Sequence, residues 1–361
     1  MTSFVESCVE TAAGSAVSVE RRWRDRPRAK RLLRVLQDKK NILLTTHQQP
    51  DPDALASSLA LGRLLRQKLP QAKISLSIKG EVPGGLNAAF TQNAQLELTP
   101  WDESLLSAYD AIILLDVQPS SRFSPLPENL PPIAVIDHHR ARGRRPVCPF
   151  CDIRIDVGAT SSIVFSYFME LEIDIPRDLA AALLFAIETD LAGAAGQPGE
   201  LDNVALSSLT LLADPHKLYK MRYVDLPQSY YVAYHDGIAN ALWQDNALVS
   251  HLESVQSPEM PAVIADFLLR FDPIHWALVS AVSGQAMVLS LRTSSAKGSA
   301  ADVMHRLVRH IGQGGGHRTK AGGFVPLETG SAAEIERLRK TLRRRLLRAL
   351  GLKMARGQRL I

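Results

Sequence analysis

The chain has 361 residues, 46% of them hydrophobic, which is enough for about two packed domains. No uncharged apolar run approaches the roughly 18 residues that a membrane-spanning helix needs, and the N-terminus shows no apolar signal core. We therefore expect a soluble, cytoplasmic protein with no membrane partner.

The net charge of +5 hides an uneven distribution. Eight basic residues and one acid lie in 21–34, and ten basic residues and no acid lie in 337–359; the rest of the chain has 24 basic and 36 acidic residues. Such basic termini could make an auxiliary nucleic-acid contact. The alternative is a solvated helical face, because leucines recur every four residues from Leu338 to Leu350.

Short apolar runs alternate with helical patterns through the first half of the chain. After a basic N-terminal arm over 1–35, the pattern predicts strands at 41–46, 73–79, 111–115 and 133–136, and helices at 54–69, 161–170 and 179–187. Thr160 or a neighbour is a plausible cap of the second of these helices. Because continuous apolar runs suit buried parallel strands, the alternation predicts an α/β domain around a mostly parallel sheet, spanning 36–195.

The second half of the chain starts with a break. Residues 193–199 are rich in glycine and proline, and a leucine-rich helical stretch, 204–219, lies within a predicted helical linker, 196–235. A smaller α/β domain is predicted over 236–361, ending in the basic helix. Within it we expect strands at 277–282 and 287–292 and a helix at 300–311, before the glycine-rich segment 312–323.

The three cysteines are too few, and odd in number, for a disulfide framework. Cys148 and Cys151 form a CxxC pair, but no second pair completes a structural zinc site. Incidental cysteines are the favoured interpretation, and a redox role is the alternative.

Acids and histidines follow several apolar elements of the first domain. They are His47, Asp51, Asp53, Asp116, Asp137, His138, His139 and Asp190. Carboxyl ends of parallel strands share one rim of an open sheet, where ligands bind. A single aspartate after a strand is usually a turn or a cap, but this many carboxylates in one crevice would repel each other without cations. Carboxylate and imidazole ligands together predict two divalent cations, preferably Mn²⁺, with Mg²⁺ or Co²⁺ as alternatives.

The segment HQQPDPDALASSLAL resembles the HxxPDxDAxGSxLAL signature of the DHH phosphoesterases, and Asp137-His138-His139 matches the triplet that names them. Farther along, GGGH at 314–317 with AGG at 321–323 resembles the accompanying DHHA1 domain. The resemblance covers about residues 40–326. It implies a DHH domain with a mostly parallel sheet and a smaller α/β DHHA1 domain. Pro52 and Ala56 depart from it, since many members have glycine at both positions.

The resemblance also implies roles for individual residues. One metal would be held by His47, Asp51 and Asp116, and the other by Asp53, Asp116, His138 and Asp190. Asp137 would orient its neighbours, and His139 would face the substrate or tune the bridging water. The substrate's phosphate would bind to Arg292, Gly314, Gly315, Gly316, His317 and Arg318.

The activity implied is hydrolysis of short oligonucleotides, of phosphoadenosine phosphate, or of both, by a hydroxide that two metals activate. Alternatives are a cyclic dinucleotide phosphodiesterase and an exopolyphosphatase- or pyrophosphatase-like hydrolase. A non-catalytic nucleotide- or RNA-binding protein on the same scaffold is a further alternative, although the complete ligand set favours the enzyme. We expect the substrate between the two domains. Homodimers are common in this group, but no segment here demonstrates one.

Overall fold

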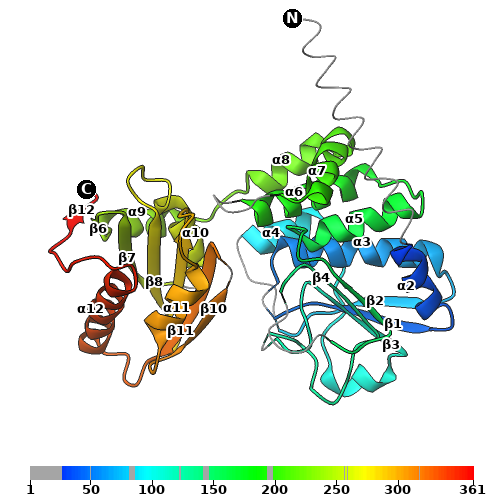
Figure 1. The fold of residues 1–361 in the computed structure, drawn as a ribbon, viewed down its shortest axis with the longest axis horizontal. Helices are drawn as coiled ribbons and strands as arrows, with labels where there is room; N and C mark the ends of the chain where they lie inside the picture. The colour runs from blue at the N-terminus through cyan, green and yellow to red at the C-terminus, as the bar shows by residue number, and fades with distance from the viewer. Residues whose placement is uncertain are drawn as a thin grey trace, which may run out of the picture. The chain divides into compact units, whose positions relative to one another are not determined.

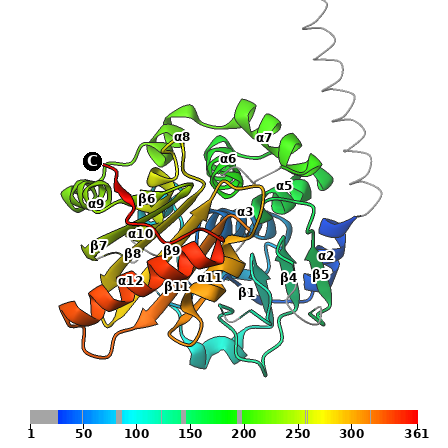
Figure 2. The same ribbon diagram turned by 60° about the vertical axis from the view of Figure 1, so that its left-hand side comes forward.

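The computed structural model describes residues 27–361 except 49, 81–85, 122, 141–145, 193–197, 256, 258 and 317. The chain forms two compact units, one ending at Val224 and the other running from Asp225 to the C-terminus (Figures 1 and 2). Most of the predicted N-terminal arm lies outside the described residues. Its last part is helix α2 (Arg28–Leu36), which buries Ala29, Leu32 and Leu36 in the core of the first unit.

A five-stranded sheet lies at the centre of the first unit, in the order β2-β1-β3-β4-β5, and every neighbouring pair is parallel. The strands are β1 (Asn41–Thr45), β2 (Lys73–Leu76), β3 (Ala111–Leu115), β4 (Ala134–Asp137) and β5 (Phe150–Ile153). Together with the second unit, this sheet confirms the predicted α/β fold class. β5 was not predicted, because its sequence, FCDI, includes the acid Asp152.

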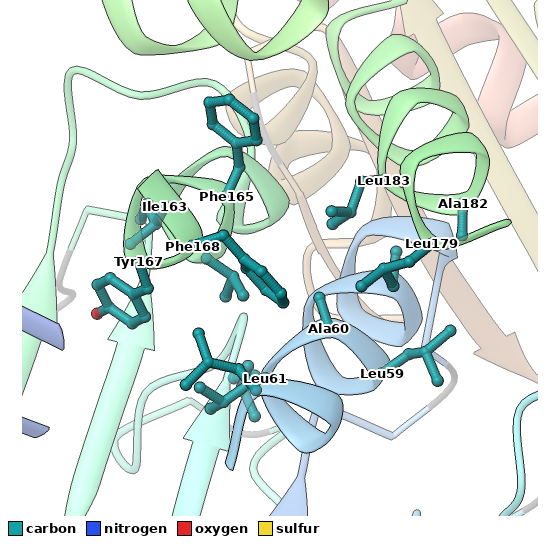
Figure 3. Close-up of a cluster of buried hydrophobic side chains, with 14 of the residues drawn as sticks. Leu59, Ala60, Leu61, Ile163, Phe165, Tyr167, Phe168, Leu179, Ala182 and Leu183 are labelled. Carbon is teal, nitrogen blue, oxygen red and sulfur yellow. The ribbon is translucent and has the colours of Figure 1, made fainter. Parts of the chain in front are cut away.

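Helices α3 (Pro52–Lys68), α5 (Thr160–Glu170) and α6 (Arg177–Leu191) form the main core of the first unit. Figure 3 shows their apolar side chains meeting, among them Leu61 of α3, Phe168 of α5 and Leu183 of α6. Helix α3 is buried over most of its length and on most of its sides, including Ser57 and Ser58. The opposite face of the sheet carries a smaller cluster next to the 3₁₀ helix η1 (Glu103–Ala108). Helix α4 (Leu86–Asn93) lies between β2 and η1 in the chain.

The segment predicted as a linker, 196–235, is divided between the two units. Helices α7 (Glu200–Leu212) and α8 (Pro215–Arg222) bury residues such as Leu209 and Met221 in the first core, whereas α9 (Gln228–Ala239) buries Tyr230 in the second unit. The helical stretch expected at 204–219 is two helices. Asp214 caps the second, and Pro215 begins it.

The second unit has a seven-stranded sheet in the order β10-β11-β9-β8-β7-β6-β12, in which only β7 and β8 pair in parallel. The strands are β6 (Leu242–Gln244), β7 (Ala247–Ser254), β8 (Trp276–Ser283), β9 (Ala286–Thr293), β10 (Gln313–Gly316), β11 (Lys320–Pro326) and β12 (Gln358–Arg359). One face packs against α9 and α10 (Met260–Leu268), and the other against α11 (Ala300–Val308) and α12 (Ala332–Ala349).

Helix α12 confirms the predicted apolar stripe, since Leu342 and Leu346 are fully buried. Cys148 and Cys151 are bonded to each other as a disulfide, so they are not two independent thiols, and their lack of a functional role stays a prediction. In the described part of the chain, no helix combines the length and the apolar character needed to traverse a membrane.

Candidate metal centre

Three of the predicted site residues lie at the carboxyl ends of strands β1, β3 and β4, on one rim of the parallel sheet. His47 follows β1, Asp116 follows β3, and Asp137 ends β4. The backbone amide of Asp116 donates to the carbonyl of Ile136 at 2.9 Å, so the ends of β3 and β4 are directly joined. Asp116 itself has φ 59°, in the left-handed region, which aspartate tolerates better than most residues. Local strain of this kind is commonly found at functional sites.

The loop after β1 becomes the start of α3. Asp51 is the N-cap, and one of its carboxylate oxygens accepts from the amide of Ala54 at 3.1 Å. Pro52 occupies the first helical position, where the missing N–H would have had no helical partner. The departure from the family pattern at Pro52 is therefore compatible with the helix start.

Asp53 is almost fully buried, and its carboxylate connects α3 to the beginning of α5. It accepts from the amides of Thr160 and Ser161 at 2.7 and 2.8 Å. The N-cap of α5 is Ala159, the neighbour of Thr160, and its side chain makes no capping hydrogen bond. A carboxylate 107 positions away accepts from the first amides of the helix instead. The Thr160 hydroxyl instead donates to Asp116 Oδ1 at 2.8 Å.

The structure brings all six predicted metal ligands together. In three overlapping groups the ligand atoms lie within 4.8 Å of one another: His47, Asp51 and Asp116; Asp53, His138 and Asp190; and Asp116, His138 and His139. Asp116 Oδ2 lies 3.5 Å from His47 Nε2, whereas Asp116 Oδ1 lies 3.4 Å from His138 Nε2. His138 Nε2 is also 3.5 Å from Asp190 Oδ2. The two oxygens of Asp116 therefore face two different groups of ligands.

Backbone carbonyls hold the outer ring nitrogens of two of these histidines. His47 Nδ1 lies 3.0 Å from the carbonyl of Gln48, and His138 Nδ1 lies 3.3 Å from that of Val157. A proton on each Nδ1 would satisfy these carbonyls and leave Nε2, the nitrogen that faces Asp116, free to bind a cation.

Asp137 holds His139 in place. The fully buried carboxylate accepts from His139 Nδ1 at 2.7 Å and from the His139 amide at 3.2 Å. Its other oxygen accepts from Gln118 Nε2 at 2.7 Å, and the same amide group donates to the His139 carbonyl at 2.8 Å. Sequence reasoning missed Gln118, and only its place two residues after Asp116 could have pointed to it.

The pKa values show a centre that is strongly charged without a cation. Burial would lower the pKa of His47, but the hydrogen bond to Asp116 and the charges of Asp51 and Asp116 raise it to about 9. Burial opposes the charged form of His139 too, yet Asp116 and Asp137 raise its pKa to about 10. Burial would raise the pKa of Asp116, but the three neighbouring histidines bring it well below its usual range. Protons on the histidines thus balance carboxylate charge.

Burial, reinforced by the negative charges of Asp116, Asp190 and Asp51, raises the pKa of Asp53 well above its usual value. Bound divalent cations would favour the ionised form instead. The donor set, with carboxylate oxygens and imidazole nitrogens in overlapping groups, therefore fits a pair of divalent cations.

The predicted substrate-binding residues lie on neighbouring strands of the second unit. Arg292 of β9 pairs in register with Lys320 of β11, and Gly316 of β10 pairs with Ala321. Arg292 donates to Asp266 Oδ1 at 2.7 Å and to Ser290 Oγ at 2.8 Å, which fixes its guanidinium.

Packing and backbone conformation also explain why glycine occupies two positions of the segment 314–316. A Cβ on Gly314 would lie 2.7 Å from the side chain of Met304, so close packing of α11 accounts for this glycine. Gly316 has φ 152°, and a Cβ there would lie 2.3 Å from the Lys320 carbonyl oxygen. Gly315 is buried in β10. Arg318 donates to the carbonyl of Ala296 at 3.1 Å, and His317 lies outside the described residues.

Comparison with known proteins finds a family match for the first part of the chain. Residues 41–187 match the family model described as DHH family, N-terminal domain. An uncharacterized protein of Methanocaldococcus jannaschii is 28% identical over 319 residues, covering 86% of this chain and 64% of that protein. A probable manganese-dependent inorganic pyrophosphatase of Streptococcus thermophilus is 29% identical over 150 residues, covering 41% of this chain and 47% of that protein.

Solved structures share the fold. An exopolyphosphatase-related protein from Bacteroides fragilis aligns with a TM-score of 0.72 at 16% identity, covering 90% of this chain and 97% of that one. RecJ from Thermus thermophilus in complex with Mn²⁺ aligns with a TM-score of 0.51 at 16% identity, covering 89% of this chain and 55% of that one.

Residues 41–187 thus match the N-terminal domain of the DHH family, which confirms the DHH part of the resemblance found in the sequence. It spans 64% of the length of the first of these relatives and about half of the pyrophosphatase.

Proposed function

We propose that the chain is a metal-dependent phosphoesterase whose first unit binds two divalent cations. The observation that carries the proposal is the position of Asp116, one oxygen facing His47 and the other facing His138. His47, Asp51 and Asp116 hold one cation, and Asp53, Asp116, His138 and Asp190 hold the other. The presence of Mn²⁺ in the RecJ structure and the name of the pyrophosphatase relative support manganese.

When bound, the cation pair lowers the pKa of a water molecule and neutralises charge on phosphoryl oxygens. The residues of the chain then have separate tasks. Asp137 accepts a hydrogen bond from Nδ1 of His139 and so fixes the ring. The other ring nitrogen of His139, on a side chain that is 29% exposed, contacts a phosphoryl oxygen of the substrate. Gln118 holds Asp137 and the His139 backbone together.

For the substrate, we propose short oligonucleotides, phosphoadenosine phosphate, or both. Arg292, Gly314, Gly315, Gly316, His317 and Arg318 bind its terminal phosphate. The support is the grouping of Arg292, Lys320 and Gly316 on adjacent strands, since cationic side chains attract phosphate and a glycine, which has no side chain, lets a phosphate approach the backbone closely. A cytoplasmic location, a homodimer and an auxiliary nucleic-acid contact also stay predictions.

A second candidate activity is hydrolysis of pyrophosphate or polyphosphate. The pyrophosphatase relative favours it, because the 29% identity extends over 150 residues. A phosphoanhydride would use the same cation pair, so the difference must come from the residues that contact the rest of the substrate.

The test is turnover of pApA, phosphoadenosine phosphate, cyclic di-AMP, pyrophosphate and polyphosphate, each with Mn²⁺ and with a chelator. We expect Mn²⁺-dependent release of mononucleotide or phosphate, which Asp116→Ala abolishes. Release of nucleotide identifies the phosphoester activity, whereas turnover of pyrophosphate or polyphosphate alone identifies the second candidate. Equal turnover by Asp116→Ala would disprove the proposal.

A further inference from the structure

One turn, 157–161, contacts several ligands of the second cation. The carbonyl of its first residue faces His138 Nδ1 at 3.3 Å. The amides at its end donate to the two oxygens of Asp53 at 2.7 and 2.8 Å. The hydroxyl of Thr160 donates to Asp116 Oδ1 at 2.8 Å. A small displacement of this turn would therefore disturb three ligands at once.

The turn is fixed from outside by Asp202 of α7. This carboxylate is fully buried, and its Oδ2 accepts from the amide of Gly158 at 2.6 Å and from that of Gly199 at 2.8 Å. Its Oδ1 has no hydrogen-bond partner among the residues that the structure describes. Burying a carboxylate costs free energy, and two hydrogen bonds to one oxygen offset only part of that cost.

The two glycines whose amides Asp202 accepts are closely packed, and neither has room for a side chain. A Cβ on Gly158 would lie 2.3 Å from Leu191 Cδ2, and Leu191 directly follows the ligand Asp190. A Cβ on Gly199 would lie 2.1 Å from the carbonyl oxygen of Asp156. The turn thus packs against the end of α6 as well, and so contacts the segment that carries Asp190, the remaining ligand of the second cation.

We infer that Asp202 is a positioning residue for the second cation, acting through the 157–161 turn. The inference rests on the proposed two-cation site. A helix-capping role explains the bond from Gly199, because Asp202 is the third residue of α7 and Gly199 is its N-cap. Capping does not explain the shorter bond from Gly158, which belongs to a different segment.

The test measures Mn²⁺ binding to the metal-free full chain by calorimetry and by electron paramagnetic resonance. Asp202→Ala should weaken the second Mn²⁺ by about 10- to 100-fold, as loss of outer partners of metal ligands does elsewhere, and leave the first nearly unchanged. Asp202→Asn should restore binding, because one amide oxygen can replace Oδ2 as the acceptor of both bonds.

Asp214→Ala is the matched control. Asp214 also accepts two amides at a helix start, those of His216 and Lys217, but both belong to α8. The Asp214→Ala variant should bind two Mn²⁺ with the same affinities as the wild type. Gly158→Ala is the second variant, because it crowds Leu191 while Asp202 remains, and it too should weaken the second Mn²⁺.

The outcomes separate the two proposals. Failure of the wild-type chain to bind two Mn²⁺ would overturn the cation site itself. Two Mn²⁺ in the wild type, with wild-type affinity in both Asp202→Ala and Gly158→Ala, would overturn the role of Asp202 alone. The role of Asp202 would also be overturned if Asp202→Asn binds the second Mn²⁺ as weakly as Asp202→Ala does. A loss of affinity in Asp214→Ala as large as that in Asp202→Ala would overturn it too. If Asp202→Ala does not fold, Gly158→Ala decides.

Discussion

At the scale of single residues, Asp116 connects the two ligand groups. Its backbone is in the left-handed region, which asparagine also tolerates, so Asp116→Asn changes the ligand while keeping the conformation. We predict that Mn²⁺ binding and turnover fall by more than the roughly 100-fold that loss of an outer partner costs. Calorimetry and steady-state kinetics measure this.

The matched control for that variant is Asp245→Asn. Asp245 has φ 52°, so the same chemical change takes place in the same backbone region, outside the candidate centre. It should leave Mn²⁺ affinity and turnover unchanged. Wild-type affinity in Asp116→Asn would contradict the bridging role.

The raised pKa values of His47 and His139 predict how Mn²⁺ affinity depends on pH. With pKa values of about 9 and about 10, both rings carry an additional proton at neutral pH when no cation is bound. Binding to His47 must displace a proton, so affinity rises with pH up to about 9, by about tenfold per unit for each proton released. Calorimetry between pH 6 and 8, in buffers of different ionisation enthalpy, counts the protons; an affinity independent of pH would contradict the prediction.

At the scale of elements, the sequence located those that carry the ligands because their signals are local. Continuous apolar runs marked β1, β3 and β4, and the acids and histidines stand directly after them. The cap of α5 could not be found in this way, because Asp53, which accepts its free amides, belongs to a distant helix. Local sequence also cannot show that one carboxylate of α7, Asp202, holds the 157–161 turn.

β5 was missed for a related reason. Asp152 lies at its centre, and a buried acid argues against a strand in a local pattern. Its charge is balanced by Arg28 and Arg154, and the Tyr167 hydroxyl donates to it at 2.7 Å. Two of these three partners come from other elements, α2 and α5, so only the tertiary structure shows why the acid can be buried.

Helix α12 shows that part of the basic C-terminus serves the fold. Arg345 donates to the carbonyls of Leu307 and Arg309, and Arg343 donates to that of Ala355. These arginines hold the helix against its own unit. The predicted auxiliary nucleic-acid contact would therefore depend on exposed residues of the same helix, such as Arg344 and Arg348.

The apolar stripe of α12 gives a stability prediction. Leu346 is fully buried against the second sheet, so Leu346→Ala should lower the free energy of unfolding of that unit by about 2–5 kcal/mol. Denaturant unfolding measures the change. Arg348→Ala, on the exposed side, is the control and should change it by no more than about 0.5 kcal/mol. Equal effects of the two substitutions would contradict the packing of the helix.

At the scale of the whole molecule, the two units have separate tasks in the proposed function. All six candidate cation ligands belong to the first unit, and Arg292 belongs to the second. Arg292→Lys should therefore raise KM while Mn²⁺ affinity stays at the wild-type value, because lysine lacks the fork that binds phosphate through two bonds. Arg270→Lys, in the same unit, is the control. A loss of Mn²⁺ binding in Arg292→Lys would contradict this division.

In the proposed site, two cations share Asp116. Anomalous scattering at the manganese edge, from crystals of the full chain grown with Mn²⁺, tests it most directly. We predict two peaks, one among His47, Asp51 and Asp116 and one among Asp53, Asp116, His138 and Asp190. A single peak, or peaks away from Asp116, would contradict the account.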